Sequence, residues 1–409
     1  MKILFIIPPP YLPNRLHRIR SFDLIKILSQ KHEVHLFAVT TKKEKPAEFE
    51  EIKKTCKSVT VLRLPLLKAI LNCFCFPHLP YEVAYCYSKE AKEKIKQIIK
   101  KEKIEFVYTK RLRSAIFLPK VSIPVVIDTT DAMSIFYKRM FKNHNFPKNL
   151  FYLLEAIKYR RFERKTMEKI KDWVVCSETD KKYLETISSS VKIEVVPNPV
   201  DTSYFQFQPI TPLRSRFEGQ ANHQSPITNH SLLFRGLMDK PVNIDAAIFF
   251  AKEIFPKVLQ RVKDAKLFIV GSNPHPKILR LANKRDIVVT GFVKDVRGYI
   301  NNTQISVCPI RIGTGARHKI LQAWGMGRPV VSTSIGAEGL LYKDGENIEI
   351  ADDPKTFAGK IIMLFENKNQ YNKLAKNGRK TVELNYRFGV VSRKLDKVLS
   401  YAVKNQKSN

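Results

Sequence analysis

Short runs of apolar residues alternate along the chain with longer amphipathic stretches. Runs such as KILFIIP, EVHLFAV and PVVIDTT are continuous rather than alternating, as in strands that are buried on both faces. Between them, stretches such as RIRSFDLIKILSQ carry apolar residues at helical spacing. Strands and helices in regular alternation predict an α/β fold, in which helices cover a parallel sheet.

The alternation is interrupted once, between residues 206 and 230. This segment is polar, contains proline and glycine, and shows no periodicity, so it predicts a linker. A second series of strands and helices follows. We therefore expect two doubly wound Rossmann-like domains facing across a cleft, at 1–205 and 231–385, and a C-terminal helix at 386–409 that packs back on the first domain. A ligand is expected in the cleft, at the carboxyl ends of the strands.

The charge of the chain is strongly positive. Its 409 residues include 72 Lys and Arg against 38 Asp and Glu, a formal net charge of +34. Such an excess indicates an anionic partner, which could be nucleic acid, an acidic membrane face or a phosphorylated ligand; a solvated lysine-rich surface is the simpler alternative. The charge is spread over almost every predicted helix and the sequence shows no nucleic-acid-binding module, so we expect no nucleic-acid partner.

Cysteine usage and hydropathy favour a cytoplasmic protein without a metal. Six cysteines do not make a disulfide framework for a chain of this length. The Cys73–Cys75 pair has no histidine or further cysteine at metal-binding spacing, and the sequence shows no Asp-x-Asp motif or histidine cluster, so we expect neither a metal nor another cofactor. MKILFIIPPP is too short for a signal-peptide core, and no run approaches the roughly 18 apolar residues of a membrane span.

One loop has the properties of a phosphate site. In RIGTGARHKI, Gly313 and Gly315 allow a ligand to approach the backbone closely, and the following helix begins with unpaired N–H groups. Arg317 and Lys319 add two full positive charges beside it. The spacing is not that of a Walker A motif, because no Ser or Thr follows the lysine. An ordinary strand–loop–helix connection remains the alternative.

The longer segment CPIRIGTGARHKILQAWGMGRPVVSTSIGAEGL closely resembles the donor-site segment of retaining nucleotide-sugar glycosyltransferases of family 4, which have the GT-B fold. ILFIIPPPYLPNRLHRIRSFDLIKILS, VVPNPVDTSYF and KDGENIEIADDPKTFAGKIIMLFEN resemble other segments of the same family, in the same order. The sequence of these segments is most similar to a subgroup associated with bacterial exopolysaccharide loci. The likeness extends over nearly the whole chain.

The resemblance implies roles for individual residues. It implies that Asp131, near the acceptor hydroxyl, and Arg317 and Lys319, at the donor diphosphate, act in catalysis. It also implies a set of donor-binding residues: Asn14 and Arg15 at the phosphates, Gly291, Phe292 and Val293 at the base, Gly313, Thr314 and Gly315 at the diphosphate and sugar, and Gln322 at the ribose.

Several positions depart from the family pattern. Thr314 and Gln322 stand where many members have glutamate, Thr130 replaces a histidine, and Leu237 replaces an arginine. The phosphate-binding residues are thus better preserved than the sugar-contacting ones. A catalytically silent relative that binds saccharide or serves as a scaffold is therefore kept as an alternative.

The resemblance implies transfer of a sugar, with retention, from a nucleotide-diphosphate donor to a saccharide or lipid-linked acceptor in cell-surface or exopolysaccharide synthesis. Two stretches, 64–81 and 136–165, interleave aromatic or aliphatic residues with lysine and arginine as interfacial helices do. They favour an anionic membrane surface as a partner, at the inner face of the plasma membrane. Solvated helices whose apolar stripe belongs to the core are the alternative.

Overall fold

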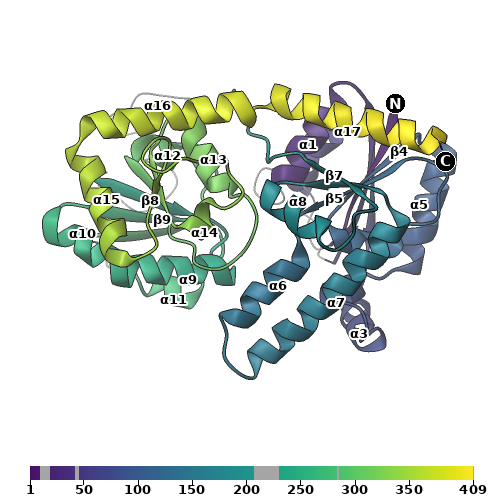
Figure 1. The fold of residues 1–409 in the computed structure, drawn as a ribbon, viewed down its shortest axis with the longest axis horizontal. Coiled ribbons are helices and arrows are strands. Elements are labelled where there is room, and N and C mark those ends of the chain that lie inside the picture. The colour runs from purple at the N-terminus through teal and green to yellow at the C-terminus, as the bar shows by residue number, and fades with distance from the viewer. Residues whose placement is uncertain (10–18, 42–45, 207–229, 283–284, 409) are drawn as a thin grey trace. The chain divides into compact units, whose positions relative to one another are not determined.

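A computed structural model describes residues 1–9, 19–41, 46–206, 230–282 and 285–408. Two compact units form the molecule: Met1–Pro199 with Phe388–Asn409, and Val200–Arg387 (Figure 1). Residues 200–205 belong to the second unit, where the Val200 N–H donates to the Tyr386 carbonyl at 2.8 Å and Arg379 donates to the Phe205 carbonyl at 3.0 Å. Most of segment 206–230 lies outside the described residues.

The first unit is built on a seven-stranded parallel sheet with the order β3-β2-β1-β4-β5-β6-β7. The strands are β1 (Lys2–Ile7), β2 (Glu33–Thr40), β3 (Ser58–Arg63), β4 (Phe106–Lys110), β5 (Val125–Thr130), β6 (Asp172–Val175) and β7 (Lys192–Val195). The strand order reverses direction between β1 and β4, which are neighbours in the sheet but not in the sequence. Such a switch point is where α/β sheets bind their ligands.

Helices cover both faces of this sheet. They are α1 (Ile19–Ser29), α2 (Pro46–Thr55), α3 (Leu66–Cys75), α4 (Tyr81–Tyr85), α5 (Lys89–Glu102), α6 (Met133–Lys142), α7 (Lys148–Lys169), α8 (Glu178–Glu185) and α17 (Phe388–Ser408), with a 3-10 turn at Leu112–Phe117. In β1, Ile3 and Phe5 belong to the core beneath α1 and α17, and Leu4 and Ile6 to the core on the opposite face. The continuous apolar run of β1 is thus explained by burial on both faces.

The second unit repeats the plan with a six-stranded parallel sheet, in the order β10-β9-β8-β11-β12-β13. Its strands are β8 (Ser231–Arg235), β9 (Lys266–Val270), β10 (Ile287–Gly291), β11 (Ile305–Cys308), β12 (Val330–Ser332) and β13 (Glu349–Ile350). The switch point here lies between β8 and β11. The predicted α/β class, with two parallel-sheet Rossmann-like domains, is confirmed.

The helices of the second unit are α9 (Pro241–Phe249), α10 (Phe255–Arg261), α11 (Pro276–Leu279), α12 (Arg297–Asn302), α13 (His318–Gly325), α14 (Ser334–Ala337), α15 (Pro354–Glu366) and α16 (Lys368–Asn385), with a π-helical turn at Phe250–Ile254. Their apolar faces and the sheet form one core, which includes the fully buried Trp324 of α13. In neither unit does a described helix have the length and apolar character needed to cross a membrane.

Candidate active site

The loop between β11 and α13 lies at the switch point of the second sheet. Gly313 has a φ of +125° and Gly315 a φ of +83°, a region of backbone conformation that favours glycine. A Cβ atom at Gly313 would lie 2.6 Å from Nη2 of Arg317. The two glycines therefore let the loop fold back against the start of α13, where Arg317 is the N-cap residue.

Arg317 presents unpaired donors at this helix start. It makes no side-chain capping hydrogen bond to α13. Its Nε and Nη2 atoms are buried and hydrogen-bond to none of the described residues. Buried donors of a charged group are costly when they are left unsatisfied. An anionic ligand at the helix N-terminus would satisfy them.

Lys319 lies one residue into α13 and points toward β8 and α9. Its Nζ donates to Oδ1 of Asn243 at 2.9 Å and lies 4.4 Å from the centre of the Phe234 ring. Burial is the main cause of a lowered pKa of about 8 for Lys319; Cys308 opposes this shift, and the guanidinium groups of Arg317 and Arg235 add to it. Lys319 forms no ion pair with a carboxylate of the described residues, so its charge is held in place without a counter-ion.

Arg235, at the end of β8, is a third cation that we did not predict from the sequence. Its Nη2 donates to the Lys319 carbonyl at 3.0 Å, and its Nε is buried without a hydrogen-bond partner among the described residues. Burial lowers the pKa of Arg235 to about 10. The only feature of the sequence that could have indicated Arg235 as a site residue is its position as a charged residue at the end of the apolar run SLLFR. The family pattern expects an arginine at position 237, which is Leu237 here. Arg235 lies two residues before that position.

Two further residues of the second unit flank Arg317 and Lys319 in the sequence. Gln322, one turn after Lys319, is 4% exposed, and its Oε1 atom is buried without a hydrogen-bond partner in the described structure. Thr314, between the two loop glycines, is 9% exposed. Neither side chain carries a charge, so the positive potential of the loop is not offset at these two positions.

The predicted base-binding residues lie at the end of β10: Gly291 is its last residue, and Phe292 and Val293 follow it. Gly291 has a φ of +70°, and a Cβ atom there would have no neighbour within 4 Å. The Gly291 carbonyl accepts a hydrogen bond from the Gly271 N–H at 3.1 Å, which ties the ends of β10 and β9 together. Phe292 is exposed and Val293 is half-buried. A flat aromatic side chain in an exposed position beside a sheet edge can stack on a ligand.

In the first unit, Asp131 comes directly after β5 in a charged environment. Its Oδ2 lies 3.5 Å from Nη1 of Arg111, and its Oδ1 accepts from the Cys176 thiol at 3.8 Å. Asp131 and Cys176 form, together with Asp180, a group with metal-ligand atoms within 4.8 Å. Both oxygens of Asp180 are already engaged, by the Ala132 N–H at 2.9 Å and by the Ser177 hydroxyl. These hydrogen bonds join Asp180 to Ala132 and Ser177, the N-cap residues of α6 and α8.

The residue before Asp131 is held by a buried charge network. Thr130 has a φ of +69°, and its hydroxyl accepts from Nζ of Lys110 at 2.9 Å. Lys110 and Arg20 both pair with Asp128, at 2.8 and 3.0 Å, and these cations hold the pKa of Asp128 down at about 2 despite its burial. The network fixes the end of β5. Asn14 and Arg15, which we predicted for the loop after β1, lie outside the described residues.

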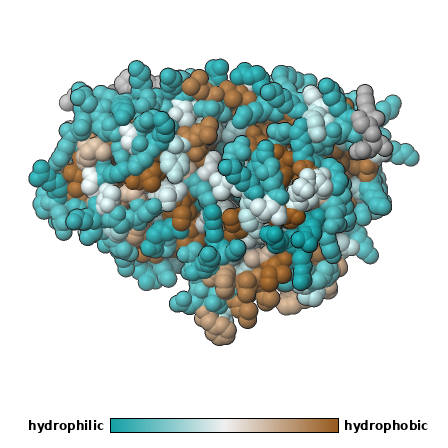
Figure 2. All heavy atoms as spheres, in the orientation of Figure 1, coloured by the Kyte–Doolittle hydropathy of each residue, from teal (hydrophilic) through white to brown (hydrophobic). Residues whose placement is uncertain are grey.

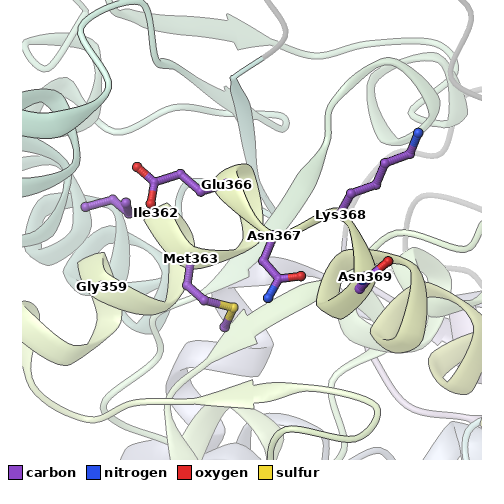
Figure 3. A pocket seen from close by; sticks show the side chains of 7 residues that line it. All are labelled: Gly359, Ile362, Met363, Glu366, Asn367, Lys368 and Asn369. Atoms are coloured by element: carbon purple, nitrogen blue, oxygen red, sulfur yellow. The ribbon is translucent and has the colours of Figure 1, made fainter.

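A shallow pocket elsewhere in the second unit does not coincide with this cluster. It is lined by residues of α15 and α16 and of the turn between them, and includes Met363, Glu366 and Lys368 (Figure 3). None of the predicted site residues lines it. The charged loop, rather than this hollow, is therefore the candidate active site of the second unit.

The chain is similar to known proteins in sequence and in structure. Residues 229–367 match the family described as "Glycosyl transferases group 1". The match spans β8 to the end of α15 and includes the cluster of Arg235, Arg317 and Lys319. A relative from Klebsiella pneumoniae, an "uncharacterized 44.6 kDa protein in cps region", is 23% identical over 393 residues, which are 92% of this chain and 94% of that protein.

Solved structures share the fold of both units. HepE from Anabaena, in complex with UDP, is 16% identical, with a TM-score of 0.66 over 98% of this chain and 100% of that one. Sucrose-phosphate synthase from Thermosynechococcus elongatus is 14% identical, with a TM-score of 0.72 over 98% of each chain. At such identity the likeness establishes the fold, which is that of the GT-B glycosyltransferases.

Proposed function

We propose that this chain, whose second unit matches the group 1 glycosyltransferases, transfers a sugar with retention from a nucleotide-diphosphate donor to a saccharide or lipid-linked acceptor, in cell-surface or exopolysaccharide synthesis. The observation that carries the proposal is the cluster of Arg235, Arg317 and Lys319. Three cations meet at a helix start, beside a glycine loop, and none pairs with a carboxylate of the described residues. Such a cluster favours binding of an anion of high charge, and a diphosphate is such an anion.

The chemistry of sugar transfer fits what these residues can do. When the bond from the sugar to the nucleoside diphosphate breaks, negative charge grows on the leaving phosphate. Fixed donors that are aimed at this developing charge lower the barrier without reorganising. Arg317 offers a forked guanidinium, Lys319 a point charge, and α13 its first N–H groups. We assign no nucleophile to the protein for this step.

The remaining site residues take proposed positions around the diphosphate. Gly291, Phe292 and Val293 would meet the base, and Gln322 would meet the ribose, because its Oε1 atom is buried and accepts no hydrogen bond from the described residues. Gly313, Thr314 and Gly315 would line the diphosphate and the sugar. From the first unit, Asn14 and Arg15 would approach the phosphates, and Asp131 the acceptor hydroxyl.

Similar proteins support a choice of donor and setting. HepE binds UDP, and other structures of that protein contain UDP with glucose, or UDP-glucose. A uridine diphosphate sugar is therefore our first choice of donor. The relative from a cps region supports a role in cell-surface polysaccharide synthesis. All six cysteines are free, which supports a cytoplasmic location.

The experiment that tests this function is a donor panel. Purified protein is incubated with UDP-, GDP-, ADP- and dTDP-sugars, with and without candidate acceptors, and release of nucleoside diphosphate is measured. We expect release from one class of donor, with UDP-sugars first. Tight binding of a saccharide without release from any donor would instead favour the silent relative, for which the neutral Thr314 and Gln322 are the motivating residues.

The affinity for UDP should fall as the pH rises from 7 to 9. The diphosphate favours protonated Lys319, whereas the free protein loses this proton with a pKa of about 8. Above pH 8 each binding event must therefore return a proton to Lys319, and Kd is expected to rise about tenfold between pH 7 and pH 9. Isothermal titration calorimetry measures this. In Lys319→Arg the dependence should disappear, because arginine stays protonated. A constant Kd in the wild type would contradict the assigned role.

A further inference from the structure

Helix α3 of the first unit exposes an apolar face. Leu67 and Phe74 are 70% and 75% exposed, and Leu66, Ile70 and Leu71 are exposed beside them. Buried Ala69 and Asn72 lie on the opposite side of the helix. Lys68 is the single charged residue of α3. A solvated helix normally shows the reverse pattern, with its large apolar residues turned inward. This face therefore indicates a binding surface.

The first half of α7 exposes a second set of large apolar side chains. Leu150, Phe151, Leu154 and Ile157 are all exposed, and Phe146, just before the helix, is 78% exposed. Figure 2 shows hydrophobic side chains gathered over this part of the molecule. The sequence pattern left open whether these residues were core residues. The structure places them at the surface.

Tyr81, the first residue of α4, joins the two helices. Its backbone N–H donates to Oε2 of Glu155 on α7 at 2.9 Å, and its ring lies 5.7 Å from that of Phe151. The Tyr81 carbonyl accepts from the thiol of Cys73 on α3 at 3.6 Å. The exposed apolar residues of α3 and of the first half of α7 thus belong to one part of the first unit, which we call the α3–α7 surface (Figures 1 and 2).

The charges around the α3–α7 surface are almost all positive. On α6 and α7 every exposed charged residue is basic except Glu168, near the far end of α7. The two other carboxylates of α7, Glu155 and Glu163, are each 1% exposed. Glu155 accepts the Tyr81 N–H, and Glu163 accepts two N–H groups at the start of α6. Burial of the acids leaves an apolar surface with a basic rim.

We infer that the α3–α7 surface binds an anionic lipid bilayer, with α3 lying in the interface and the basic residues of α6 and α7 on the headgroups. The apolar residues supply the insertion and the cations supply the electrostatic attraction, as in interfacial helices. A second copy of the chain is a poorer occupant, because a symmetric dimer would bring two basic rims together. The inference concerns the first unit alone and does not depend on the proposed transferase activity.

Sedimentation with vesicles tests the inference. The full chain is mixed with phosphatidylcholine vesicles that contain or lack about 30% phosphatidylglycerol, at 0.1 and 0.5 M salt. We expect binding to the anionic vesicles at low salt, and little binding to neutral vesicles or at high salt. The triple variant Leu67→Ser, Leu71→Ser, Phe74→Ser should bind at least about tenfold more weakly. Loss of three rim charges in Arg160→Gln, Arg161→Gln, Arg164→Gln should have a similar effect.

Matched control variants test whether the loss of vesicle binding is specific to the α3–α7 surface. Leu279→Ser, Leu341→Ser, Leu384→Ser removes three exposed leucines of the second unit, and Lys92→Gln, Lys94→Gln, Lys100→Gln removes the same charge from α5. Both should bind vesicles like the wild type, and urea unfolding should show that every variant is folded. UDP binding is measured in parallel. A protein that binds vesicles but not UDP would contradict the proposed donor without contradicting the membrane inference. Equal vesicle binding by the wild type and the α3 variant would overturn the inference, as would a dimer that forms through this surface without lipid binding.

Discussion

Replacement of Lys319 by methionine should lower kcat for sugar transfer by roughly 10²- to 10³-fold, the loss that follows removal of one fixed donor from a developing anion. Methionine keeps most of the length and the apolar stem of lysine but removes the charge. The free energy of unfolding should stay equal or rise, because burial already disfavours the charged form of Lys319, as its lowered pKa shows. A loss of activity without a loss of stability is the expected signature of a phosphate-binding residue.

Two measurements are needed for this variant. Release of nucleoside diphosphate under saturating donor gives kcat, and urea unfolding gives the stability. Lys373→Met, at an exposed position of α16, is the matched control and should change neither quantity. If Lys319→Met were strongly destabilised, its contacts with Asn243 and Phe234 would be structural, and the catalytic assignment would fail.

Replacement of Gly271 by alanine should destabilise the protein by about 4 kcal/mol or more, beyond the range of most single substitutions. Gly271 follows β9, and its Cβ would lie 1.7 Å from the carbonyl oxygen of Gly236 at the end of β8. The clash is with the backbone, so no side chain can turn away to relieve it. The backbone φ of +157° adds strain for a residue with a side chain.

Gly359 provides the comparison for this second variant. It lies on an exposed face of α15, and a Cβ atom there would meet nothing within 4 Å. Gly359→Ala should therefore stabilise the protein by up to about 1 kcal/mol, from helix propensity alone. Urea unfolding measures both variants. A Gly271→Ala protein as stable as the wild type would show that the ends of β8 and β9 are not packed as described.

The alternation of apolar runs and amphipathic stretches was enough to predict the parallel α/β class of both units. The prediction succeeds because a strand such as β1 buries Ile3 on one face and Leu4 on the other. Consecutive residues of a buried strand are therefore all apolar. The loop glycines could be predicted as well, because their positive φ is a local property.

Three features could not be predicted, because each depends on contacts between distant residues. Arg235 and Lys319 are far apart in the sequence and meet only when β8 lies beside β11. The close approach of Gly271 to Gly236 likewise depends on the pairing of β8 and β9. The apolar face of α3 has the spacing of an ordinary core stripe, and periodicity alone does not say whether such a stripe is covered.

Titration of nucleoside mono- and diphosphates into the wild-type protein tests the central claim most directly. Each charge-assisted hydrogen bond from the cluster of Arg235, Arg317 and Lys319 should add about 1.5 to 3 kcal/mol, so we expect UDP to bind at least about tenfold more tightly than UMP. In Lys319→Met this difference should shrink by about tenfold or more, because one of the three cations is lost. Equal affinity for the two nucleotides in the wild type, or no binding of any nucleoside diphosphate, would contradict a diphosphate site formed by Arg235, Arg317 and Lys319.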